Sequence, residues 1–198
     1  ELLKDKASEG QVRRDAARSL GEIGSVDPQV LSALTTTLED SDERVRKDAA
    51  RALGKIGSAD PQVLLALTTT LKDSDERVRK YAARALGKIG SADPQVLLAL
   101  TTALKEEDER VRYSAARALG EIGSDDPQVL SALTTALEDS EWRVRYSAAK
   151  ALGKIGSADP QVLLALTTTL KEDTEREVRR SATQALGEIE SAQEPADR

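Results

Sequence analysis

DPQVLLALTTTLKDSDERVRKYAARALGKIGSA, residues 60–92, decides the fold, because it contains two helical patterns joined by short loops. Asp60 before Pro61 is a helix N-cap followed by proline at the first helical position, where a missing N–H costs nothing. Apolar residues at helical spacing follow, and the residues KDSD at 72–75 interrupt the pattern. These features predict a first helix, named helix A here.

The second half of the stretch predicts another helix, named helix B. Ser74 or Asp75 could cap its start, and Gly90 is placed to end it as a C-terminal glycine. Its apolar stripe consists of Val78, Ala82, Ala85, Leu86 and Ile89. One such pair of helices cannot bury both of its stripes, so neighbouring pairs must stack.

The pattern recurs along the whole chain. Asp-Pro-Gln-Val returns every 33 residues, at Asp27, Asp60, Asp93, Asp126 and Asp159. The first valine of helix B returns at Val12, Val45, Val78, Val111, Val144 and Val178, the last interval being one residue longer. We therefore expect one all-α repeat array over residues 1–198. Its parts are a truncated first repeat (1–26), full repeats (27–59, 60–92, 93–125, 126–158), a last repeat (159–190) and a frayed tail (191–198). Residues 1–7 look like the end of another helix A.

Composition excludes several classes of function. The chain has no Cys and no His, so disulfides, thiolate or imidazole metal ligands and the commonest general base are absent. We therefore expect no cofactor, no metal and no catalysis. The net charge of −6 argues against a globally basic nucleic-acid binder. No apolar run approaches the roughly 20 residues that cross a bilayer, and no signal peptide is visible, so a soluble, cytoplasmic protein is expected.

The run V-R-x-x-A-A-x-A-L-G-x-I-G, for instance Val78 to Gly90, resembles the short HEAT-like repeats of bacterial phycobilin-lyase type. It also resembles the artificial alphaRep binders built on that consensus. The departures are few: Ser19 and Thr183 replace alanine, and Glu190 replaces glycine. The resemblance implies a right-handed α-solenoid of about six two-helix repeats, with the outward face of helix B lining a concave surface. It is specific for fold and weak for function.

Positions in helix B are numbered from its valine as position 0. Positions 0, +4, +7, +8 and +11 share the core sector, and −2, +2 and +6 point the opposite way. Trp142 and Tyr146 occupy −2 and +2 of one repeat, Tyr113 occupies +2 of the repeat before, and Tyr81 at +3 lies on a flank. These are all the aromatic residues of the chain, and Trp142, Tyr146 and Tyr113 are expected to form one cluster.

Tyrosine and tryptophan with arginine nearby are the residues that dominate binding hot spots. The sequence therefore predicts a non-catalytic scaffold that binds a macromolecule, above all a protein, through the helix B surface. The partner-binding residues would be Trp142, Tyr146, Tyr113, Tyr81, Arg117, Lys150, Arg143, Arg84 and Lys80. The opposing interpretation is that the aromatics only cover neighbouring aliphatic surface.

Other interpretations stay open. Basic residues at +2 and +6 could track a nucleic-acid backbone. The array could be the sensor section of a larger signalling protein, or a designed or consensus repeat protein with no natural ligand. Neither end shows a strongly polar capping repeat, so end-to-end self-association is also expected. Arginine recurs at +1, six residues after an acid, and we assign this acid–arginine pattern to packing between repeats.

Overall fold

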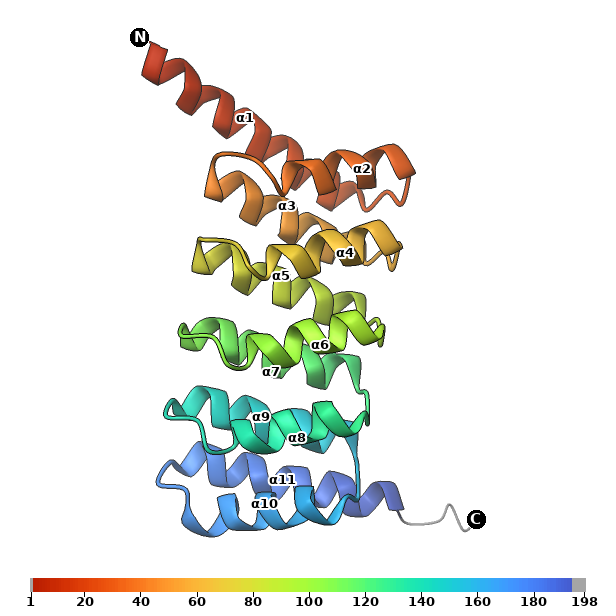
Figure 1. Ribbon diagram of the computed structural model, residues 1–198, viewed down its shortest axis with the longest axis vertical. Helices are drawn as coiled ribbons and strands as arrows, with labels where there is room; N and C mark the ends of the chain where they lie inside the picture. Colours follow the sequence, from red (N-terminus) through yellow and green to blue (C-terminus); the bar gives the residue numbers. More distant parts are fainter. Residues whose placement is uncertain (1, 194–198) are drawn as a thin grey trace. The chain divides into compact units, whose positions relative to one another are not determined.

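The computed structural model describes residues 2–193, with side chains from residue 9, and this part of the chain consists of helices and short loops without strands (Figure 1). The A helices are α2 (Pro28–Thr37), α4 (Pro61–Thr70), α6 (Pro94–Ala103), α8 (Pro127–Ala136) and α10 (Pro160–Glu172). The B helices are α1 (Leu2–Ile23), α3 (Glu43–Ile56), α5 (Glu76–Ile89), α7 (Glu109–Ile122), α9 (Trp142–Ile155) and α11 (Arg176–Gln193).

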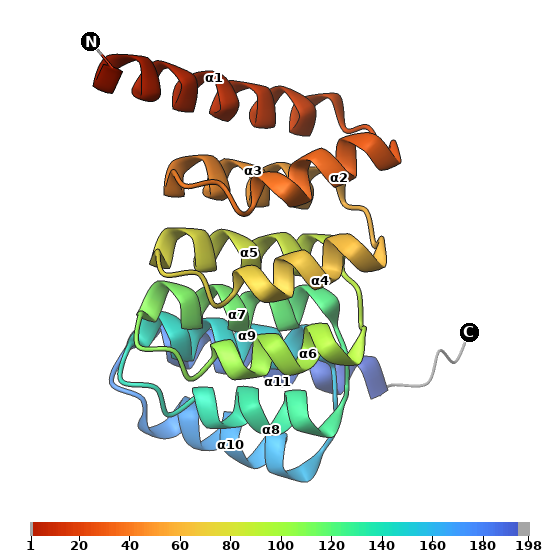
Figure 2. The ribbon, with the colours of Figure 1, turned by 45° about the horizontal axis from the view of Figure 1, so that its top comes forward.

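The chain divides into two compact units between Ser91 and Ala92. In the first unit α1, α3 and α5 pack side by side, and α2 and α4 form a second layer against them (Figure 2). In the second unit α7, α9 and α11 form one layer and α6, α8 and α10 the other. The fold is thus an all-α solenoid of about six two-helix repeats. Its right-handed sense and the continuity of one array stay predictions.

The two helices of the repeat at residues 60–92, α4 and α5, begin and end where the sequence pattern places them. Asp60 accepts a hydrogen bond from the N–H of Gln62 and caps α4. Asp75, and not Ser74, caps α5, because its carboxylate accepts hydrogen bonds from the N–H groups of Arg77 and Val78. Gly90 ends α5 with a φ of 71°, a left-handed conformation that glycine adopts without strain.

The core of each unit is aliphatic and tightly spaced. The valine at position 0 and the leucine at +8 of α3, α5, α7 and α9 are completely buried. The B helices approach each other most closely where the glycine at +9 faces the alanine at +7 of the next helix. A Cβ added to Gly54 would lie 2.7 Å from the Cα of Ala85, and one added to Gly120 would lie 2.6 Å from the Cα of Ala151. Only glycine fits this approach, which sets the spacing between repeats.

The first helix differs from the expectation that residues 1–7 end a separate helix A. From Leu2 to Ile23 the chain is one continuous helix, α1. Two substitutions explain the missing loop. Ala7 replaces the loop aspartate represented by Asp40, and Glu9 replaces the N-cap represented by Asp42. Within the described residues α1 has no helix A of its own repeat, and Val12 is 68% exposed whereas Val45 is fully buried.

The last helix also differs from expectation. The predicted frayed tail begins at residue 191, but α11 continues to Gln193. Glu190 stands where the other repeats have the glycine that ends helix B, so the left-handed stop is lost. Residues 194–198 of the predicted tail lie outside the described residues.

Candidate binding groove on the B helices

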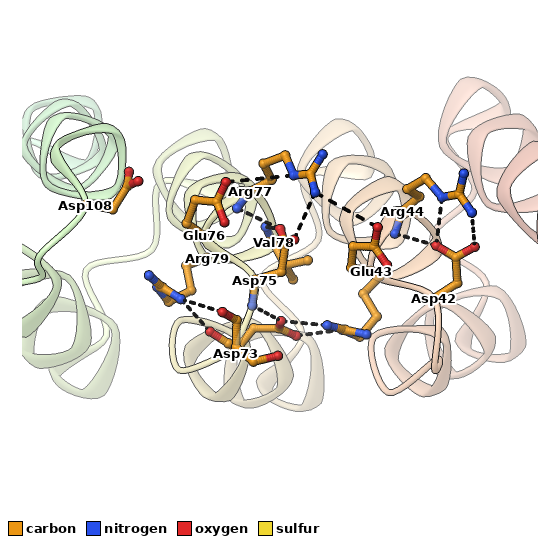
Figure 3. Close-up of polar contacts among 12 residues, drawn as sticks. Asp42, Glu43, Arg44, Asp73, Asp75, Glu76, Arg77, Val78, Arg79 and Asp108 are labelled. Atoms are coloured by element: carbon orange, nitrogen blue, oxygen red, sulfur yellow. Dashed lines mark hydrogen bonds and ion pairs between the residues drawn. The ribbon is translucent and has the colours of Figure 1, made fainter.

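The arginine at +1 ties each repeat to the next within a unit. Arg112 donates to Asp139 from Nε and Nη2 at 2.7 and 2.9 Å, and its Nη1 donates to the carbonyls of Glu106 and Glu107. Arg46 binds Asp73 in the same way, and Figure 3 shows Arg79 donating to the Asp73 carbonyl. The predicted acid–arginine pattern is therefore structural.

The electrostatics of these pairs follow from their partial burial. Burial alone would raise the pKa of Asp139, but hydrogen bonds from Arg112 and from the N–H of Glu141 outweigh it and lower that pKa. The pKa of Arg112 is raised, chiefly by its hydrogen bonds to Asp139. Both groups therefore stay charged at neutral pH, and their ion pair joins α7 to the loop that precedes α9.

A second arginine, at −1, folds back on the N-cap of its own helix. Arg44 donates to Asp42 at 3.0 and 3.1 Å, and Arg77 donates to Asp75 at 3.2 Å (Figure 3). In α9 the N-cap residue is Glu141, whose side chain makes no capping hydrogen bond.

Arg143 of α9 takes a different position from these arginines. Its guanidinium lies 4.9 Å from the ring centroid of Trp142. Such a cation–π contact places Trp142 and Arg143 together at the start of α9.

A groove of about 230 Å³ runs between α7 and α9. It is lined by Tyr113, Arg117, Gly120 and Glu121 of α7 and by Tyr146, Ser147, Lys150, Ala151 and Lys154 of α9. Positions +2 and +6 of two neighbouring repeats thus meet in one hollow. Four of the sequence-predicted partner residues line it: Tyr113, Tyr146, Arg117 and Lys150. Trp142 and Arg143, although on the same helix α9, are not among its lining residues.

The groove carries an excess of positive charge. Arg117 donates from Nε to Glu121 at 2.8 Å, and this hydrogen bond is the main reason that the pKa of Arg117 is raised. Lys150 and Lys154 are exposed and form no ion pair or hydrogen bond with the described residues. Ser147 donates from Oγ to the Tyr113 carbonyl at 3.3 Å. The arrangement offers two unpaired ammonium groups beside two tyrosine rings.

The other predicted residues lie in the first unit. The Nζ of Lys80 is 5.2 Å and the guanidinium carbon of Arg84 is 5.5 Å from the ring centroid of Tyr81. Tyr81 is therefore already in contact with two cations of its own helix.

Sequence reasoning missed Glu121, Ser147 and Lys154 in the groove, and Asp48 in the first unit. Asp48 is 1% exposed and is bound by Arg14 at 3.1 Å and by Arg18 at 3.0 Å. Position +3 could have revealed it, because its residues change character along the chain: Asp15, Asp48, Tyr81, Ser114, Ser147 and Ser181.

The described residues contain no group of three or more acidic side chains placed to hold a metal ion. Nor is any helix within residues 2–193 long and apolar enough to span a membrane.

Known structures with the same fold include engineered proteins. One engineered protein solved by crystallography is 29% identical, with a TM-score of 0.61 and 92% coverage of both chains. A designed armadillo repeat protein in complex with the peptide (KR)4 is 24% identical, with a TM-score of 0.63, and the match covers 88% of this chain and 92% of that one. Human deoxyhypusine hydroxylase is 23% identical with a TM-score of 0.55, over 92% of this chain and 80% of that one. Likeness at 23–24% identity shows the fold alone.

No curated protein matches the sequence. The family model for HEAT repeats matches residues 1–73, 64–139 and 97–187. Together these ranges cover residues 1–187, which include every described helix except the end of α11. The chain belongs to the HEAT repeat family.

Proposed function

We propose that the protein is a non-catalytic scaffold that binds a protein partner, as a peptide segment, through the groove between α7 and α9. The observation that carries the proposal is the meeting of Tyr113 and Tyr146 with Arg117 and Lys150 around one hollow. Tyrosine rings give a large contact area at small entropic cost, and flanking cations fix orientation. The designed armadillo relative with bound (KR)4 peptide supports the use of such a fold for peptide binding.

A peptide display selection tests the proposal. A random peptide library is panned on the immobilised protein, the enriched peptides are sequenced, and their affinities are measured by fluorescence anisotropy. We expect Tyr146→Ala to weaken the enriched peptides about 30-fold, because a central hot-spot side chain contributes about 2 kcal/mol.

Tyr81→Ala is the matched control, since it removes a tyrosine from a B helix of the other unit, and it should leave the affinities unchanged. Trp142→Ala tells whether the partner reaches the start of α9. Selected peptides that bind Tyr113→Ala and Tyr146→Ala as tightly as the unchanged protein would exclude this groove.

Self-association is a second candidate property, favoured by the exposed stripe of α1. Val12 and Ile23 are 68% and 71% exposed, although Val45 at the position equivalent to Val12 is fully buried. We expect concentration-dependent growth in mass by multi-angle light scattering, abolished by Val12→Glu. Mass that stays monomeric at high concentration contradicts it.

A further inference from the structure

The chain itself shows what can fill a groove between two B helices. The pair α1–α3 and the pair α7–α9 are related by 99 residues, three repeat lengths. In α1–α3 the position +3 carries Asp48, whose buried carboxylate is bound by Arg14 and Arg18 and lies 3.7 Å from the Nζ of Lys47. One buried carboxylate thus contacts cations of both helices there.

In α7–α9 the equivalent of Asp48 is Ser147. The acid is gone, and the 230 Å³ hollow lies at this place. Arg117, the equivalent of Arg18, bonds instead to Glu121 of its own helix. Of the three cations around Asp48, the groove keeps only the equivalent of Arg18, because Tyr113 replaces Arg14 and Tyr146 replaces Lys47. Lys150 and Lys154 supply the other positive charges of the groove.

Lys154 of the groove also differs from its equivalent in the first pair. Lys55 of α3 pairs with Glu22 of α1. Its equivalent, Lys154, has no acid partner among the described residues, because Glu121, the equivalent of Glu22, is engaged by Arg117. Lys150 also has no acid partner among the described residues, so the two ammonium groups that face the hollow are not ion-paired.

We propose that the α7–α9 groove receives an acidic side chain of a peptide partner, whose carboxylate takes the place that Asp48 fills in α1–α3. The inference rests on the proposed peptide-binding function and adds the chemistry of the partner: an aspartate or glutamate with an apolar neighbour that lies on Tyr113 and Tyr146. A carboxylate fits better than a phosphodiester chain. The net charge of −6 repels a polyanion along its whole length, whereas a single acid meets Lys150 and Lys154.

The test uses defined probes on the full chain. Fluorescence anisotropy compares a peptide with a single Glu flanked by Leu, Ala and Gly with the same peptide carrying Gln for Glu, and with single-stranded oligothymidylate. We expect the Glu peptide to bind about tenfold more tightly than the Gln peptide and to lose this advantage in high salt, because the attraction is between exposed charges.

Ser147→Asp is the decisive variant, because it supplies within the protein the carboxylate that the peptide would bring. It should weaken the Glu peptide about tenfold and leave the Gln peptide unchanged. Ser131→Asp, on the exposed surface of α8, adds the same charge away from the groove and should change neither affinity. Should Ser147→Asp fail to fold by circular dichroism, Lys150→Gln combined with Lys154→Gln replaces it, since both lysines are exposed.

Equal binding of the Glu and Gln peptides, no effect of the groove variants, or absent binding of the Glu peptide overturns the inference. Oligothymidylate that binds more tightly than the Glu peptide overturns it in favour of a phosphate ligand. The display selection judges the proposed function separately: selected peptides that lack acidic residues but depend on Tyr146 would leave peptide binding standing without the acidic partner.

Discussion

The pairs α1–α3 and α7–α9 share a backbone arrangement and differ on the face they turn outward. In both pairs a glycine faces an alanine, Gly21 against Ala52 and Gly120 against Ala151, with no room for a Cβ. On the outer face the first pair closes around Asp48, and the second leaves a groove beside Ser147. The contacts that set the spacing of repeats are thus separate from those that set surface chemistry.

The largest effect is expected where the two pairs are alike. Gly21→Ala and Gly120→Ala should each lower the free energy of unfolding by about 3 kcal/mol, because the new Cβ would overlap the backbone of the next helix. Urea unfolding followed by circular dichroism measures both. Gly187→Ala is the control: it occupies the same repeat position in α11 but meets nothing within 4 Å, so it should stabilise by about 0.5–1 kcal/mol. A Gly120→Ala variant as stable as the unchanged chain would show that the helices part freely.

The next largest effect is expected to differ between the two helix pairs, at the arginine at position +1. Arg112→Ala should cost about 2–3 kcal/mol, because it removes hydrogen bonds to Asp139 and to two carbonyls from a side chain that is only 13% exposed. Arg13→Ala removes a similar pair with Asp40, but Arg13 is 42% exposed, so a clearly smaller loss of stability is expected. Both are measured by urea unfolding, and equal losses would contradict the role given to burial and loop contacts.

Giving α3 the residue that α9 has at position +3 tests how much the outer face of the first pair contributes to stability. Asp48→Ser should destabilise by about 1–2 kcal/mol, because Arg14 and Arg18 lose their charged acceptor while keeping some access to water. Thermal unfolding at low and high salt checks the result. An unchanged midpoint would mean that Asp48 contributes no net stability, as for buried ion pairs whose desolvation cost offsets their attraction.

The smallest effect concerns the helix starts. Asp42 caps α3, whereas its equivalent Glu141 makes no capping hydrogen bond in α9. Glu141→Asp should therefore stabilise by about 0.5–1 kcal/mol, and Asp42→Glu should destabilise by a similar amount. Calorimetric melting temperatures measure the two shifts, and a Glu141→Asp variant that melts no higher would show that this helix start needs no side-chain cap.

The sequence predicted most of the fold because helix caps, helix stops and apolar stripes act locally. Asp60 before Pro61 and Gly90 after Ile89 mark helix ends through their own backbone geometry, and the structure places the ends there. The continuous α1 and the extended α11 could also have been read, from Ala7, Glu9 and Glu190, which lack those local features.

The candidate groove could be predicted only in part. The spacing of Tyr113 and Tyr146 placed them on facing helices, and the structure brings both to one hollow. Whether a cation is neutralised depends on a side chain of the next helix, about one repeat away, as Arg14 and Asp48 show. Arg117 could bond to an acid of its own helix α7 or to one of α9. It bonds to Glu121 of α7 because α9 has Ser147 where the first pair has an acid.

The ion pairs between the arginine at +1 and the loop aspartate of the next repeat also bear on how the protein folds. Among the described residues, each of these ion pairs joins side chains 27 or 28 positions apart, as Arg13 with Asp40 and Arg145 with Asp173. Loops of this length close quickly, and low contact order is associated with fast folding. Any repeat with one neighbour can serve as a folding nucleus, and loss of structure begins at the ends of each stack, where a helix has only one neighbour to hold it.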